Sequence, residues 1–247
     1  FENYVLRSIH LLLNPKKSKA LHAAGVSLLV DYIMFGYKHG EVYGIIAKAN
    51  AEAKKEYEKD SKEANTRIEM MRIQELNTQL VKQIVNALGL YCLDQNRTIR
   101  HMATYGLGEC ARLLDYETHF KPVMEETLDK LKTCILMPGA KNAAFAGSTC
   151  NAVTAVFKIF MANVINSAQK SVSEQEAQKA STEDHKYLLA AVQATMEVSL
   201  SEQQKQLLQF WFSCLPVKGD AAECKIIYSV LVAILKHKAG VSNTMRS

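Results

Sequence analysis

The feature that most constrains the fold of this chain is the segment 94–114, D-Q-N-R-T-I-R-H-M-A-T-Y-G-L-G-E-C-A-R-L-L. A turn residue, Asp94, precedes an apolar–arginine pair, Ile99–Arg100. Small and apolar residues then follow at helical spacing, and these are Ala103, Leu107, Ala111 and Leu114. That spacing places them on one face of a helix. Because one helix pair cannot bury such faces alone, the pattern predicts helices that stack on neighbouring helices.

The composition favours an all-α fold. The 247 residues include only 4 Pro and 11 Gly, and 48% are hydrophobic, enough for a sizeable core. Good helix formers such as Ala, Leu, Lys, Gln and Glu dominate. Alternation of apolar and polar residues never lasts four positions with β-branched enrichment, so no strand is expected.

Helical periodicity divides the chain into about four antiparallel helix pairs, which together would form an α-α superhelix. We expect the pairs at approximately 1–39, 70–116, 117–165 and 185–238 of a single solenoid spanning 1–247. Ser18 is expected to cap the second helix, and Asp220 is expected to cap the helix 221–238.

Two polar segments interrupt the predicted pairs. The charged stretch 47–67 has few large apolar residues, and we interpret it as an insertion that is either a solvated helix or a loop. The stretch 167–184 is rich in Ser, Gln, Glu and Lys and is predicted to be a linker.

Several function classes lack support in the sequence. The net charge of +5 is spread along the chain, whereas nucleic-acid binders cluster Lys and Arg on one face. The seven His residues form no i,i+4 pair, which argues against a metal site. No Ser-His-Asp or Cys-His constellation stands out, and the glycines of Tyr105–Gly108 lie inside a predicted helix rather than a phosphate loop. We therefore expect no enzyme, no cofactor and no metal.

The cysteines and the hydropathy pattern bear on two further questions, disulfide formation and membrane insertion. The six cysteines form no C-x-x-C motif and are expected to be reduced core thiols; they are Cys92, Cys110, Cys134, Cys150, Cys214 and Cys224. No run of about 18 apolar residues is expected, because the best candidate, 143–157, carries Ser148, Thr149, Asn151 and Thr154. We therefore expect no membrane insertion.

The chain opens on Phe1 within a helical pattern, which suggests a piece of a longer protein.

The pattern around Asp94 resembles the inner helix of a HEAT repeat. Further, Asp94, Ile99, Arg100, Ala103 and Leu107 within 94–108 look like an inner helix of the importin-β (karyopherin-β) nuclear transport receptor family. The likeness is to the C-terminal HEAT repeats of the karyopherin beta-three, or importin five, type. The stretch 142–158, ending A-V-F-K, is similar to that family's A-V-G-K segment.

A third stretch resembles the family's W-x-x-x-L-P-x-x-x-D-x-x-E turn between its last helices. It is carried by Trp211, Leu215, Pro216, Asp220 and Glu223. The three stretches occur in the family's order, which makes the likeness more specific than any one of them.

The resemblance implies a receptor that carries protein cargo through the nuclear pore by binding without catalysis. Its partners would be cargo proteins with nuclear localisation signals, Phe-Gly nucleoporins in shallow grooves between outer helices, and Ran-GTP through N-terminal repeats that lie outside this chain. It would shuttle between cytoplasm and nucleus. The alternative is a HEAT-repeat scaffold or regulatory subunit outside transport, because it would share the Asp/Arg signature.

The residues that carry the resemblance are expected to serve structure first. Asp94 would cap its helix, and Arg100 would bridge neighbouring repeats by a charge-assisted hydrogen bond. Trp211, with Phe210 and Phe212 beside it, is expected to belong to the core rather than to an exposed aromatic site. Cargo and pore contacts cannot be assigned to residues from the sequence.

Overall fold

The computed structural model describes residues 11–12, 14, 16–37, 81–137, 143–169 and 200–244. Over these residues the chain is helical and contains no strand, which confirms the all-α prediction. The predicted insertion 47–67, most of the linker 167–184 and the predicted helix 185–200 lie outside the described residues, apart from 167–169 and Leu200. The chain divides into two compact units, Phe1–Thr127 and Leu128–Ser247, which are described separately.

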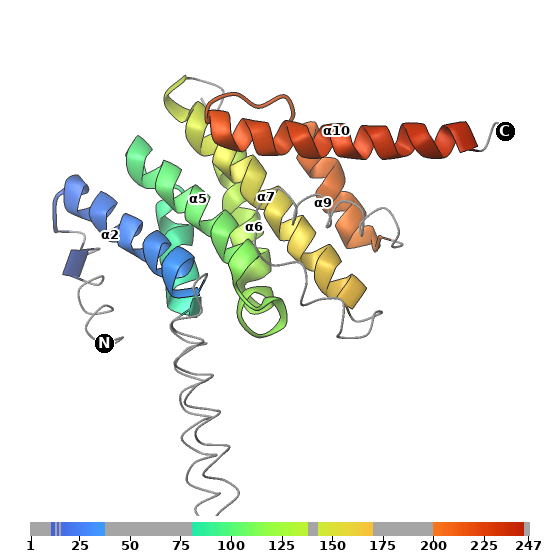
Figure 1. Ribbon diagram of the computed structural model, residues 1–247. Coiled ribbons are helices and arrows are strands. Elements are labelled where there is room, and N and C mark those ends of the chain that lie inside the picture. Colours follow the sequence, from blue (N-terminus) through green and yellow to red (C-terminus); the bar gives the residue numbers. More distant parts are fainter. Residues whose placement is uncertain are drawn as a thin grey trace, which may run out of the picture. The chain divides into compact units, whose positions relative to one another are not determined.

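In the first unit, helix α2 (Lys19–Asp31) continues directly into a π-helical segment, η1 (Tyr32–Tyr37). A helix over 81–91 and a short turn lead to α5 (Arg97–Leu113). The segment η2 (Tyr116–Phe120) then leads into α6 (Lys121–Leu136), whose residues from Leu128 onward belong to the second unit. Figure 1 shows α2 lying against α5, as the contacts between these helices require. Ser18 caps α2 as predicted, since its hydroxyl accepts a hydrogen bond from the Leu21 amide at 3.4 Å.

The core of the first unit lies between α2, the helix 81–91 and α5. Its fully buried apolar side chains include Val26, Ile33, Leu88, Ile99, Ala103 and Leu107. Gly106 lets these helices approach closely, because a Cβ at that position would lie 2.6 Å from Val30 Cγ2 and 3.1 Å from Leu88 Cδ1. Gly106 therefore serves the close packing of these helices.

In the second unit, helix α7 (Ala143–Gln169) packs against both α9 (Glu202–Ser213) and α10 (Ala221–Thr244). Every residue of 151–160 is buried, so this part of α7 is covered on all sides and forms the centre of the unit. A capping box begins α9, where Ser201 Oγ accepts from the Gln204 amide and Gln204 Oε1 accepts from the Ser201 amide.

Helix α7 is longer and more apolar than the sequence analysis predicts. It continues to Gln169, so the predicted linker begins at least three residues too early. By length and composition the segment Ala146–Ser167 could cross a membrane, and the prediction that no such apolar run exists is therefore wrong. The residues beyond Phe157, including Ile159, Met161 and Val164, offset the polar ones before it. In this structure 83% of the most apolar window is buried, which is also the property of a core helix.

Candidate functional site

The turn before α5 is built around Asp94. Its Oδ1 accepts a hydrogen bond from the Asn96 amide at 2.7 Å, and its Oδ2 accepts one from Lys19 Nζ at 2.8 Å. The helix cap itself is Asn96, whose Oδ1 accepts from the Thr98 and Ile99 amides at 3.0 and 3.3 Å. The prediction that Asp94 caps the helix is thus wrong, because Asn96 stands immediately before the first helical residue. Asp94 instead holds the turn and ties it to α2.

These contacts lower the pKa of the Asp94 carboxyl. Burial acts to raise it, but the hydrogen bonds from Lys19 and the Asn96 amide, together with the positive charge of Lys19, outweigh that effect. The carboxylate is therefore the form that the folded state favours.

Arg100 closes the same turn from within α5. Its side chain is 1% exposed, and Nη1 donates to the carbonyl oxygens of Asp94 at 2.6 Å and Gln95 at 3.3 Å. These carbonyls replace water around the guanidinium, which a buried charge requires. Its predicted role as a bridge between neighbouring repeats stays a prediction. Ile99, Ala103 and Leu107 are completely buried, so the signature around Asp94 builds the fold.

The second group of predicted residues surrounds the end of α9. Trp211 is completely buried, and its ring centroid lies 4.7 Å from that of Phe157 on α7. The expectation that Trp211 belongs to the core is confirmed. Phe212 is 37% exposed and Phe210 is half-buried, with Lys132 Nζ 5.8 Å from its ring centroid. The aromatic cluster therefore has a buried centre and a surface edge.

The segment Leu215–Asp220, called here the α9–α10 turn, is held by close contacts with both α10 and α7. Tyr228 of α10 donates its hydroxyl to the Val217 carbonyl at 2.9 Å and accepts from the Val217 amide at 3.1 Å. Gly219 has φ of 142°, and a Cβ there would lie 2.6 Å from the Ala146 carbonyl carbon and oxygen. Glycine is required at this position both by its backbone conformation and by the close approach of α7.

Three further members of the predicted motif lie in this turn, and they differ in role and burial. Asp220 caps α10 as predicted, since its Oδ1 accepts from the amides of Ala222 at 2.9 Å and Glu223 at 3.1 Å. Leu215 is half-buried and Pro216 is exposed. The sequence predicted the turn itself, but not the contacts of Val217, Gly219 and Tyr228 that hold it in place.

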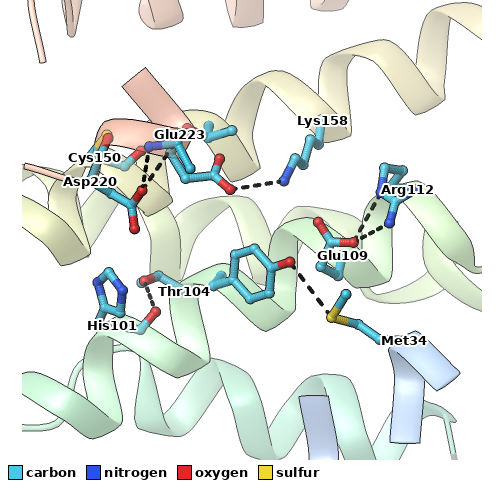
Figure 2. Close-up of polar contacts among 12 residues, drawn as sticks. Met34, His101, Thr104, Glu109, Arg112, Cys150, Lys158, Asp220 and Glu223 are labelled. Atoms are coloured by element: carbon cyan, nitrogen blue, oxygen red, sulfur yellow. Dashed lines mark hydrogen bonds and ion pairs between the residues drawn. The ribbon is translucent and has the colours of Figure 1, made fainter. Parts of the chain in front are cut away.

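Glu223 forms a buried ion pair that the sequence analysis missed. Its Oε1 lies 3.6 Å from Nζ of Lys158 on α7, and both side chains are less than a tenth exposed. Figure 2 shows the carboxylate of Glu223 pointing toward the Lys158 ammonium. The pair joins the first turn of α10 to the middle of α7. A lysine inside the apolar run 150–164 was the signal that could have identified it, because lysine is almost never fully buried without a partner.

Two cysteines meet beneath the same turn. Cys150 of α7 and Cys224 of α10 have their sulfur atoms 3.5 Å apart, and all six cysteines are free thiols. Burial raises the pKa of Cys150 to about 12, with the hydrogen bond to Cys224 adding to the effect. The thiol form is therefore strongly favoured near neutral pH.

Among the described residues, the predicted site residues serve packing, turns and helix caps. Over the described ranges, no group of three or more His, Cys, Asp or Glu side chains could hold a metal ion. In the described part of the second unit, the buried charged side chains of Lys158 and Glu223 pair with each other inside a packed core. Comparison of the chain with protein-family models, with curated proteins and with solved structures finds no match.

Proposed function

We propose that this chain is the C-terminal part of a nuclear transport receptor, a HEAT-repeat solenoid that carries protein cargo through the nuclear pore by binding without catalysis. The observation that carries the proposal is the ordered likeness of 94–108, 142–158 and 211–223 to the importin-β family. The all-α architecture is compatible with it.

The burial pattern supports a binding role over a catalytic one. The side chains of the two motifs are used for packing and for turns: Leu107 and Trp211 are fully buried, and Asp94 and Asp220 hold turns. Recognition would then fall to exposed apolar side chains on the helix surfaces. In the described residues, these include Leu21 and Leu28 on α2, Leu90, Leu136, and Phe212.

The proposed contact with the pore is weak at each site. One exposed leucine or phenylalanine gives a phenyl ring a small apolar surface, and burying it stabilises the complex by only a few kcal/mol at most. Several such sites on one receptor and many repeats on one nucleoporin would add up through effective concentration. Such binding allows fast exchange, which transport requires.

The experiment is binding of the full chain to an immobilised Phe-Gly-repeat peptide, with a Ser-Gly peptide of the same length as the control. We expect weak, rapidly reversible binding that depends on Phe. Substitution of Leu90, Leu136 or Phe212 by Ser, one at a time, should leave the fold intact because these side chains are exposed, and should locate the contact. Equal binding of both peptides, or binding of neither, would overturn the proposal for these repeats and favour a scaffold.

A further inference from the structure

The thiols of Cys150 and Cys224 are placed for reaction with each other. They are 74 positions apart in the sequence, and their sulfur atoms are 3.5 Å apart in space. A disulfide has a sulfur–sulfur bond of about 2.05 Å, so the two atoms must approach by roughly 1.5 Å. Rotation of the two side chains can bring the sulfur atoms this much closer while α7 stays packed against α10.

The surroundings of the pair favour thiol chemistry over metal binding. Cys150 Sγ lies 3.8 Å from the Asp220 carbonyl oxygen, and Cys224 Sγ lies 3.8 Å from the Val217 carbonyl oxygen. Both thiols therefore sit under the α9–α10 turn. A structural zinc site needs four ligands of the Cys or His type. No metal-binding cluster includes these two residues in the part of the chain that the structure describes.

We propose that Cys150 and Cys224 are a redox-responsive pair, oxidised to a disulfide between α7 and α10 by a small-molecule disulfide of the glutathione type. The inference is independent of the function proposed above.

The reaction proceeds by two successive thiol–disulfide exchanges. Cys224, which is half-buried, is the more accessible thiol; its thiolate attacks one sulfur of oxidised glutathione and expels a glutathione thiolate. Cys150, which is buried, then attacks the Cys224 sulfur and expels the second glutathione. The two thiol protons pass to the two released glutathione thiolates. Two electrons leave the cysteine pair and reduce one oxidised glutathione to two molecules of the thiol.

The link would fasten the first turn of α10 to α7. It would close a loop of about 75 residues, and disulfides that close long loops restrict the unfolded chain most. The Leu215–Asp220 segment lies inside that loop and is already tied to α10 through Tyr228. Oxidation should therefore stabilise the second unit without a large change in its fold.

Cys214 offers a matched control in the same unit. It is half-buried like Cys224, and its sulfur likewise lies near a backbone carbonyl, that of Phe210 at 3.2 Å. Among the described residues, no second thiol lies within hydrogen-bond distance of its sulfur. Oxidation at Cys214 should stop at the mixed disulfide, whereas oxidation at Cys224 should proceed to the cross-link.

The experiment treats the full chain with mixtures of reduced and oxidised glutathione, blocks free thiols, and maps proteolytic peptides by mass spectrometry. We expect a Cys150–Cys224 linked peptide without retained glutathione, in the wild type and in C214S. C150S should accumulate the mixed disulfide at Cys224, and C224S should form no link. The thermal unfolding midpoint of the oxidised wild type should rise by roughly 5–10 °C.

The wild-type peptide map decides the matter even if a variant does not fold. A Cys224 that stays reduced, or stays as a mixed disulfide with glutathione, at every ratio tested would overturn the proposal. A link from either cysteine to a different partner would overturn it as well. The same mapping in urea provides the pattern of random pairing against which the native link is judged.

Discussion

The buried ion pair between Lys158 and Glu223 gives the sharpest test of the second unit. Replacing Lys158 by Met removes the ammonium but keeps a long apolar side chain in its place. The Glu223 carboxylate then remains in a region where its side chain is 7% exposed, without the charge that lies 3.6 Å from it in the wild type. A buried charge left without its partner is strongly destabilising because its lost hydration is not replaced.

The expected cost follows from that burial. Breaking one partner of a buried pair typically lowers the free energy of unfolding by about 3–5 kcal/mol. The 3.6 Å separation is longer than a charge-assisted hydrogen bond, so we expect a value near 3 kcal/mol. Replacing both residues by Met should cost about 1 kcal/mol or less, because a well-packed apolar pair avoids the desolvation of both charges.

Urea denaturation followed by tryptophan fluorescence measures these changes. Trp211 is the only tryptophan of the chain and is fully buried in the same unit, so its emission reports unfolding there. With a denaturant slope of about 1–3 kcal/mol per molar urea, K158M should move the midpoint down by roughly 1–3 M. The control is K205M, which removes an exposed pair with Glu202 of 2.7 Å and should cost less than about 1 kcal/mol.

Two outcomes would refute the reasoning. If K158M costs no more than K205M, the pair is hydrated in solution and the burial seen here does not govern its energy. If the double variant is as unstable as the sum of the K158M and E223M effects, the two side chains act independently and do not form a pair.

Two other predictions concern the first unit. G106A should lower the free energy of unfolding by about 1–3 kcal/mol, because the added Cβ would overlap the stiff Val30 side chain and crowd Leu88. Urea denaturation followed by circular dichroism measures this loss, and adding V30A to G106A should recover part of it. A G106A variant that is more stable than the wild type would contradict the close packing. Burial acts to raise the pKa of Asp94, but Lys19 and the Asn96 amide lower it overall. The ionised carboxylate should therefore contribute its full share of the stability above about pH 4, the ordinary pKa of an aspartate. That contribution should be lost as the pH falls through the lower pKa of the folded state. D94N should remove this part of the acid dependence, and an Asp94 carboxyl that titrates in its ordinary range by NMR would contradict the prediction.

Local signals in the sequence predicted much of the fold. Ser18 and Asp220 were identified as caps because a capping side chain bonds amides only two or three residues ahead, so its role depends on nearby sequence alone. The same reasoning failed at D-Q-N-R, where two residues that can cap stand two positions apart. Only the position of the first helical residue decides between Asp94 and Asn96.

The contacts that join helices could not be predicted in the same way. Helical period identifies which face of α7 or α10 is apolar, but it does not specify which residue of one meets which residue of the other. The pairs Lys158–Glu223 and Cys150–Cys224 depend on the relative rotation and translation of two helices about 70 positions apart. Their partners therefore emerge only from the packed structure, although a lysine amid apolar residues marks one end.

Gly219 brings two backbones together without any side chain between them. Its α-carbon faces the peptide group joining Ala146 to Gly147, at a distance that leaves no room for a methyl group. Substitutions elsewhere in a protein are often compensated by trimming a neighbouring side chain, but a main-chain neighbour cannot be trimmed. Position 219 should consequently be among the least mutable of the chain, and a residue change there would demand a shift of the whole first part of α7. In a library of random variants selected for folding, glycine at 219 should persist where most surface positions drift freely.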